Sequence, residues 1–164
     1  MTQADLTRLA LKLKDKGQTI AFAESITGGM LISEFVKAKG VSDVLLGSIV
    51  TYAEEVKQKV LGVKKQTLKL YTAESQQVTN EMVMGLHKLL KAGVCVAVTG
   101  LCGAGASESK EKPVGTVFFS ILCDGKVEEF REVFPGNGTQ IRQKAAEFIF
   151  RKIEDTLDRH FEHH

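Results

Sequence analysis

The run Val-Cys-Val-Ala-Val at residues 94–98 constrains the fold most, because none of its side chains is polar. A strand with one face in water alternates apolar and polar residues, so an unbroken apolar run is typical of a strand covered on both faces. Strands that alternate with helices predict a layered α/β fold. Further strands are expected at 18–23, 42–53, 116–123 and 126–134, and helices at 4–16, 24–37, 54–61, from 75 or 79 to 91, and from 137 or 139 onward.

Two glycines add detail to this fold. The β-branched run within 42–53 predicts a buried strand with a bulge at Gly47, and Asp124-Gly125 is the turn of a β-hairpin between the last two strands. A chain of 164 residues suits one domain. We therefore expect one three-layer domain at residues 1–161, with a mixed, mostly parallel sheet flanked by helices and one β-hairpin. Residues 162–164 are interpreted as the remnant of an affinity tag.

Charge and composition exclude several classes of function. The chain has 22 basic and 20 acidic residues, a net charge of +2, which argues against binding nucleic acid through bulk charge. No apolar stretch approaches the ~18 residues that a membrane span needs. Three scattered cysteines predict a reducing, cytoplasmic environment. Because His87 is the only histidine outside the last five residues, we expect neither histidine catalysis nor a metal site, and no cofactor.

The first candidate site is the segment Ala-Glu-Ser-Ile-Thr-Gly-Gly at residues 23–29. It follows a strand and is expected to open a helix, where free backbone N–H groups favour an anion. Ser25 would be exposed there, Gly28 and Gly29 would allow close approach of a ligand, and the same N–H groups would stabilise an oxyanion. The alternative is that Ser25 or Thr27 is only a helix cap.

The second candidate is the strand-to-helix junction at 51–57, where Tyr52 and Lys57 are expected to point into one cleft. A serine nucleophile needs a base, and a lysine serves if burial lowers its pKa from about 10.4 toward neutrality. The alternative is that Lys57 is solvated on the helix surface.

The third candidate is the glycine-rich loop that follows residues 94–98. Thr99 and Gly100 end the strand and Gly103 lies in the loop, the usual place for ligands in open α/β sheets. The loop is neither a Walker nor a Rossmann motif. Arg142, in the first turn of the last helix, is a candidate for a phosphate or carboxylate ligand. The alternatives are a plain connection and a surface arginine.

Six ordered motifs together resemble the CinA C-terminal domain family over about residues 4–157. The motifs are Ala-Glu-Ser-x-Thr-Gly-Gly at 23–29, Thr-Tyr-x-x-Glu-x-Lys at 51–57, Leu-Gly-Val at 61–63, Thr-Gly-x-x-Gly at 99–103, Lys-Pro-Val-Gly-Thr-Val at 112–117, and Pro-Gly with Ile-Arg within 135–142.

The resemblance implies a metal-independent amidohydrolase that converts nicotinamide mononucleotide to nicotinate mononucleotide and ammonia. Ser25 would be the nucleophile, Lys57 its general base, and Tyr52 would orient the lysine or share its proton. Backbone N–H groups near Thr27 and Gly28 would form the oxyanion hole. The nucleotide would be held by Thr99, Gly100, Gly103 and Arg142. The partner would be a small pyridine nucleotide, not nucleic acid or membrane, and the protein would be a homo-oligomer.

Four departures from the family pattern leave the activity open. Ile26 stands where the family usually has cysteine, Ala53-Glu54 replaces Ser-Asn, residues 103–106 replace Gly-Pro-Gly-Gly, and Glu74 replaces the valine of Ala-Val-Ser. Glu54 near Lys57 would raise the pKa of the lysine and oppose its work as a base. Two alternatives to the deamidase therefore stand: an impaired family member that binds a nucleotide or a partner, and a hydrolase of another small amide.

Overall fold

Five strands form one mixed sheet in the computed structural model, which describes residues 1–103, 105 and 107–161. The spatial order is β2-β1-β3-β4-β5. The pairs β1–β2 and β1–β3 are parallel, whereas β3–β4 and β4–β5 are antiparallel, so only β4 runs against the other four. The mixed, mostly parallel sheet is therefore confirmed. The strands are β1 (Ile20–Glu24), β2 (Leu45–Val50), β3 (Val94–Gly100), β4 (Thr116–Cys123) and β5 (Lys126–Val133).

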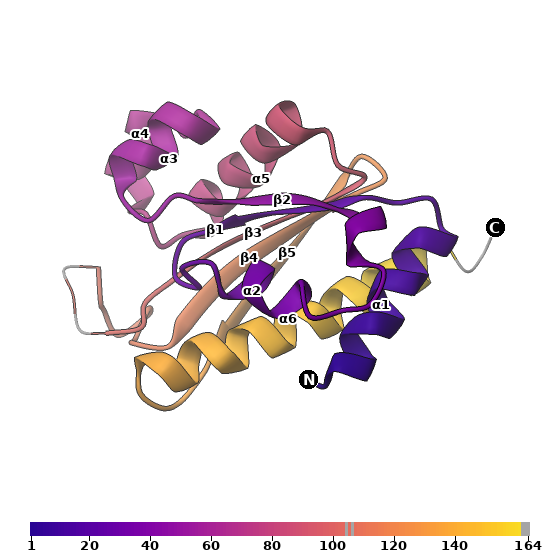
Figure 1. Ribbon diagram of the computed structural model, residues 1–164. Helices are drawn as coiled ribbons and strands as arrows, with labels where there is room; N and C mark the ends of the chain where they lie inside the picture. Colours follow the sequence, from indigo (N-terminus) through magenta and orange to yellow (C-terminus); the bar gives the residue numbers. More distant parts are fainter. Residues whose placement is uncertain (104, 106, 162–164) are drawn as a thin grey trace.

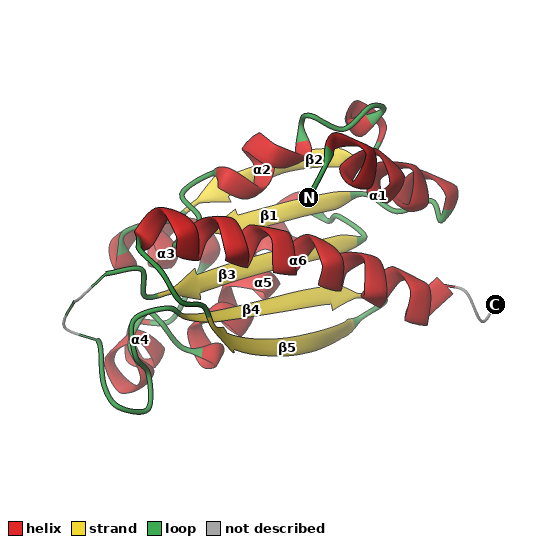
Figure 2. Ribbon diagram, turned by 90° about the horizontal axis from the view of Figure 1, so that it is seen from below, coloured by secondary structure: helices red, strands yellow, loops and turns green. Residues whose placement is uncertain are grey.

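Helices cover both faces of the sheet and complete the expected three layers (Figures 1 and 2). One layer contains α1 (Gln3–Asp15), α2 (Met30–Phe35) and α6 (Gly138–Phe161). The opposite layer contains α3 (Glu54–Leu61), α4 (Lys65–Tyr71) and α5 (Gln76–Leu90). None of the helices within the described part of the chain has both the length and the apolar character that crossing a bilayer requires.

Each layer has its own hydrophobic core, and β1 contributes to both. Ile20 and Phe22 belong to the core under α1, α2 and α6, whereas Ala21 and Ala23 belong to the core under α3, α4 and α5. Phe22 packs its ring edge-to-face against the ring of Phe35, with centroids 6.0 Å apart. Because side chains of β1 alternate between the two faces, both helix layers pack on this strand. Its last residue, Glu24, therefore lies at the sheet edge between the two layers.

The local signals at element ends are mostly confirmed. Gly62 ends α3 in the left-handed region with φ of 70°, and the Ser75 hydroxyl accepts a hydrogen bond from the Val78 amide at the start of α5. Asp124 and Gly125 form the hairpin turn with φ of 52° and 74°. Each of these structures depends on residues within a few positions of one another, so the sequence predicts them well.

Three expectations about secondary structure are wrong. The helix expected at 24–37 spans only Met30–Phe35, because residues 25–29 form a turn. The strand expected to be buried is the edge strand β2, and Leu46 and Val50 on it are exposed. Its bulge is confirmed, since the register with β1 shifts between Leu45 and Gly47. Helix α4 was not expected, because only Leu68 of its side chains is buried and its apolar pattern is short.

Candidate functional site

Glu24, the last residue of β1, is completely buried, and its carboxylate accepts five hydrogen bonds. Because a buried carboxylate is costly unless it is fully hydrogen-bonded, these donors fix the turn that follows the strand. Sequence patterns alone assign no role to Glu24, although an acid directly before Ser-x-Thr-Gly-Gly is a visible signal. Its Oε1 accepts from the Thr27 hydroxyl (2.8 Å) and from the amides of Gly29 (3.2 Å) and Leu31 (2.8 Å), and its Oε2 accepts from the Ile32 amide (3.3 Å) and the Ser48 hydroxyl (2.6 Å).

The N-terminus of α2 is therefore not an anion site for a ligand. The helix has six residues, and the amides of Gly29, Leu31 and Ile32 donate to the carboxylate of the chain's own Glu24. The helix dipole stabilises that carboxylate instead. The expectation that Gly29 offers its backbone to a substrate is wrong for its amide, because that donor is already used inside the protein.

Ser25 and Lys57 meet at the end of the sheet, although 32 positions separate them in the chain. Ser25 follows β1, and Lys57 projects from α3, which follows the neighbouring strand β2. Lys57 Nζ donates to Ser25 Oγ at 3.0 Å and to the backbone carbonyls of Thr51 (2.7 Å) and Tyr52 (2.9 Å). Lys57 is 1% exposed and Ser25 is 9% exposed, so the alternative of a solvated lysine and the expectation of an exposed serine are both wrong.

Burial lowers the pKa of Lys57 below its ordinary value. Desolvation is the largest effect, and the negative charges of Glu74 and Glu54 oppose it. The expectation that Glu54 raises the pKa has the correct sign, but burial outweighs it. A lowered pKa increases the fraction of neutral amine, whose lone pair accepts the proton of a serine hydroxyl.

Tyr52 contacts Lys57 with its backbone carbonyl and not with its phenol. Its carbonyl accepts the hydrogen bond from Lys57 Nζ, while the side chain is 71% exposed. The expectation that its side chain enters a shared cleft is wrong, because Tyr52 lies in the exposed connection before α3. In this connection the backbone carbonyl of Tyr52 faces Lys57.

Two backbone amides next to Ser25 remain available as donors. The Gly28 amide donates to the Ser25 carbonyl at 3.1 Å, which closes the turn. Among the described residues, the amides of Ile26 and Thr27 donate to no other group. The Gly28 amide is thus already used, and the amides of Ile26 and Thr27 are candidate donors to an oxyanion.

Thr99 and Gly100 lie at the same end of the sheet but are tied to protein neighbours. Glu24 pairs with Val98 in the register of β1 and β3, so Thr99 follows beside Ser25. Thr99 is buried, and its hydroxyl lies 2.9 Å from that of Thr79. A Cβ on Gly100 would lie 2.8 Å from Ile26 Cδ1, so close packing explains this glycine.

Arg142 contacts the glycine-rich loop, and in the described part of the chain neither has a direct hydrogen bond to the Ser25–Lys57 pair. The Arg142 guanidinium donates to Cys102 Sγ at 3.3 Å, and the neighbouring Gly103 is exposed. Residues 104 and 106 of the expected loop, and the expected tag remnant at 162–164, lie outside the described residues. Arg142 therefore lies against the glycine-rich loop that follows β3.

The connection from α4 to α5 is linked to Thr99 through hydrogen bonds of Thr79, and sequence reasoning did not assign it to the site. Lys112 Nζ donates to Thr72 Oγ1 and to the Glu74 carbonyl, both at 2.7 Å. Burial lowers the pKa of Lys112, while Glu74 raises it and Arg131 lowers it. Lys112 begins the Lys-Pro-Val-Gly-Thr-Val motif, which is the sequence signal for this contact.

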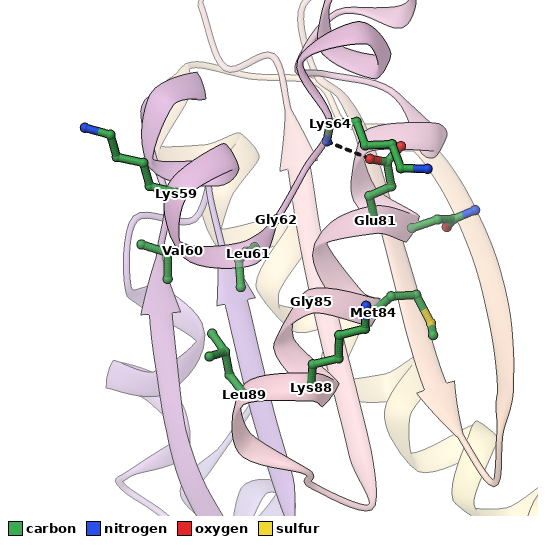
Figure 3. Close-up of a pocket in the computed structure, with 11 residues that line it drawn as sticks. Lys59, Val60, Leu61, Gly62, Lys64, Glu81, Met84, Gly85, Lys88 and Leu89 are labelled. Carbon is green, nitrogen blue, oxygen red and sulfur yellow. Dashed lines mark hydrogen bonds between the residues drawn. The ribbon is translucent and has the colours of Figure 1, made fainter.

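A cavity of about 540 Å³ lies elsewhere, between the end of α3 and α5 (Figure 3). Leu61, Gly62, Glu81, Met84 and Leu89 are among its lining residues, and neither Ser25 nor Lys57 is. The chemistry of the Ser25–Lys57 pair is therefore separate from this cavity.

Comparisons with known proteins agree with the fold and the motifs. The model of the CinA C-terminal domain matches residues 3–157. A CinA-like protein of Petrotoga mobilis is 38% identical over 149 residues, 91% of this chain and 37% of that protein. A CinA-like protein of Thermotoga neapolitana is 43% identical over 145 residues, 88% of this chain and 35% of that protein. The chain thus spans little more than a third of the length of these relatives.

Solved structures are similar over nearly the whole chain. A competence-damaged protein (CinA) superfamily protein of Klebsiella pneumoniae has a TM-score of 0.91 at 29% identity, covering 97% of this chain and 99% of that one. The competence/damage inducible protein CihA of Agrobacterium tumefaciens has a TM-score of 0.88 at 29% identity, covering 95% and 94%. Both carry the same arrangement of elements as this chain.

Proposed function

The chain belongs to the CinA C-terminal domain family, and from this and the Ser25–Lys57 contact we propose that it is a serine amidohydrolase. Its proposed substrate is nicotinamide mononucleotide, which it hydrolyses to nicotinate mononucleotide and ammonia. The observation that carries the proposal is the 3.0 Å hydrogen bond between Ser25 Oγ and the buried Nζ of Lys57. A serine beside a lysine with a lowered pKa is a nucleophile with its own base.

The acylation step uses groups that lie around Ser25. Neutral Lys57 Nζ accepts the hydroxyl proton as Ser25 Oγ attacks the carboxamide carbon. The amides of Ile26 and Thr27 donate to the oxygen that becomes negative. Lys57 then gives its proton to the leaving nitrogen, which departs as ammonia and leaves an ester on Ser25.

Deacylation repeats these steps with water. Lys57 Nζ removes a proton from a water molecule, the resulting hydroxide attacks the ester carbonyl, and Ser25 Oγ leaves with the proton that Lys57 returns. The carbonyls of Thr51 and Tyr52 hold Nζ in place throughout, since each accepts one of its hydrogen bonds. Deacylation releases nicotinate mononucleotide and restores the free enzyme. Over the two steps one water molecule is consumed and one ammonia is released.

A second candidate function is nucleotide binding without turnover. The observation in its favour is that Glu74 and Glu54 both raise the pKa of Lys57 and so increase the fraction of charged lysine, which is not a base. Tight binding of nicotinate mononucleotide with no ammonia release would support this candidate over the hydrolase.

The test is ammonia release from nicotinamide mononucleotide by the purified wild type and by matched pairs of variants. Ser25→Ala is compared with Ser33→Ala, an exposed serine of α2, and Lys57→Met is compared with Lys59→Met, an exposed lysine of α3. Loss of a general base lowers kcat by about 10²–10⁴-fold. We expect Ser25→Ala to lose at least as much, while both control variants keep their activity and all four keep the circular-dichroism spectrum. Undiminished turnover in Ser25→Ala would sink the mechanism.

A further inference from the structure

The two outermost strands of the described sheet, β2 and β5, differ in charge (Figure 2). β5 carries charged side chains along its length, at Lys126, Glu128, Glu129, Arg131 and Glu132. β2 has the sequence Leu-Leu-Gly-Ser-Ile-Val and no charged residue, and the uncharged stretch continues to Ala53. Because charges on an edge strand keep it from pairing with another chain, β5 is protected against such pairing and β2 is not.

The backbone of β2 has unused hydrogen-bonding groups on its outer side. Its pairing with β1 occupies one side of the strand, and none of the described strands lies on the other side. In the described part of the chain, no hydrogen bond outside this pairing involves a backbone N–H or C=O group of Leu45–Val50. A row of outward N–H and C=O groups is a template for a further strand. The occupant that fits this edge is therefore an extended segment of polypeptide.

Apolar side chains lie along the same edge. Leu46 is 49% exposed, Val50 is 44% exposed, and Tyr52, which follows the strand, is 71% exposed. The bulge lies between Leu45 and Gly47, so the segment from Gly47 to Val50 keeps a regular register with β1. Exposed apolar surface beside unpaired backbone groups is typical of an interaction site and not of a surface that stays in water.

The lack of charge selects a second copy of this chain as the occupant. Two copies of β2 do not repel each other, whereas a charged strand such as β5 would bring unpaired charges against an apolar edge. A twofold axis perpendicular to the sheet brings two identical edges together antiparallel, and antiparallel strands exchange their hydrogen bonds symmetrically. We propose that two copies of this chain form a dimer by antiparallel pairing of their β2 edges, which joins the two sheets into one.

The proposed interface ends close to the Ser25–Lys57 pair. Tyr52 follows the last residue of β2 by two positions, and its carbonyl accepts a hydrogen bond from Lys57 Nζ. The groups that pair across the interface belong to β2, whereas Ser25 follows β1 and Lys57 lies on α3. The dimer therefore does not depend on the proposed activity, and its test needs no substrate.

Sedimentation equilibrium from about 1 μM to about 1 mM protein measures the dimer and its dissociation constant. Val50→Lys adds a charge at the β2 edge, and the control Val133→Lys adds the same charge to a similarly exposed valine of β5. Because both side chains are exposed, we expect both variants to keep the circular-dichroism spectrum of the wild type. The control should keep the dissociation constant within about twofold, whereas Val50→Lys should weaken the dimer at least about tenfold. Leu46→Lys, at a second exposed position of β2, should weaken it too.

Hydrogen exchange of the backbone amides locates the interface. As the protein concentration rises through the dissociation constant, the amides of residues 45–50 should exchange more slowly, while the exchange of residues 126–133 should not change. Three results overturn the inference: a monomer over the whole concentration range, a dimer that resists both Val50→Lys and Leu46→Lys, or a dimer without slower exchange in residues 45–50. The proposed function is judged separately by ammonia release from the wild type.

Discussion

Replacement of Glu24 by glutamine tests whether this buried carboxylate holds the turn that carries Ser25. The side chain keeps its size, but the amide nitrogen that replaces Oε2 is a donor and faces the Ile32 amide, which then has no acceptor. The Ser48 hydroxyl can turn to accept from the new amide, so that contact is kept in weaker form. The bonds to Oε1 remain, without the assistance of a full charge.

The expected cost follows from these contacts. A buried donor without an acceptor costs ~1–3 kcal/mol, and a hydrogen bond to a charged group, worth ~1.5–3 kcal/mol, becomes a neutral one worth ~0.5–1.5 kcal/mol. Part of this loss is offset, because a buried charge no longer has to be removed from water. We expect the free energy of unfolding to fall by ~3 kcal/mol, which lowers Tm by ~6–12 °C for a chain of this size.

Calorimetric melting of the wild type, Glu24→Gln and Glu34→Gln measures this effect. Glu34 lies on α2, the helix whose Ile32 amide donates to Glu24, and pairs with Lys37 at 2.9 Å on the surface. Its replacement should change the free energy of unfolding by less than ~1 kcal/mol, because exposed ion pairs contribute little. If Glu24→Gln costs no more than Glu34→Gln, the five hydrogen bonds do not stabilise the turn and the reasoning is refuted. We also expect Glu24→Gln to lower kcat for ammonia release, since the turn positions Ser25.

Three further predictions concern the pH dependence and the packing. The folded pKa of Lys57 lies below its ordinary value of 10.5, so the unfolded chain binds the extra proton, and stability should rise with pH up to about 10.5 in the wild type relative to Lys57→Met. Urea titrations across that window check the sign, and a parallel pH dependence in both proteins would contradict it. The acidic limb of kcat/KM should likewise reflect deprotonation of Lys57 at a pH below 10.5, and a limb at or above that value would contradict the role of burial. Gly85→Ala should lower the free energy of unfolding by ~3 kcal/mol, because the new Cβ would lie 1.9 Å from the Leu61 carbonyl oxygen and α3 would have to move away from α5. Chemical denaturation measures the loss, and an unchanged midpoint would show that the two helices can separate freely.

The pairing of Ser25 with Lys57 was implied by the resemblance to the CinA C-terminal domain family, and the sheet supplies the physical reason for it. Both residues follow the carboxyl ends of strands, and β1 and β2 are parallel neighbours whose ends meet at one edge. The prediction failed for the Tyr52 side chain and for the Gly29 amide, because each depends on which way a short connection turns. Spacing along the chain does not contain that information.

Glu24 and Lys112 show why other members of the site were not found. The Glu24 carboxylate accepts a hydrogen bond from the hydroxyl of Ser48, 24 positions away on another strand. Lys112 Nζ donates a hydrogen bond to Thr72 Oγ1, 40 positions away. Such hydrogen bonds form only when separate elements pack together, so no local sequence pattern predicts them. Their motifs are visible in the sequence, but the motif does not say what each residue touches.

The sequence by itself determined the kinds of elements in this protein. The apolar run at 94–98 forms a strand with every residue from Val94 to Val98 buried, and the hairpin at Asp124 and the cap at Ser75 form where they are expected. These features depend on contacts within a few residues of each other, which the order of amino acids specifies directly.

Only the tertiary structure decided that β2 is an edge strand, that Lys57 is buried, and that burial outweighs Glu74 and Glu54 in setting its pKa. Desolvation and charge interactions depend on every group that packs around a side chain, and those groups come from distant parts of the chain. The residues next to a lysine in the sequence do not show whether it lies on the surface or beside a nucleophile. The packing of α3 against the end of the sheet makes the difference.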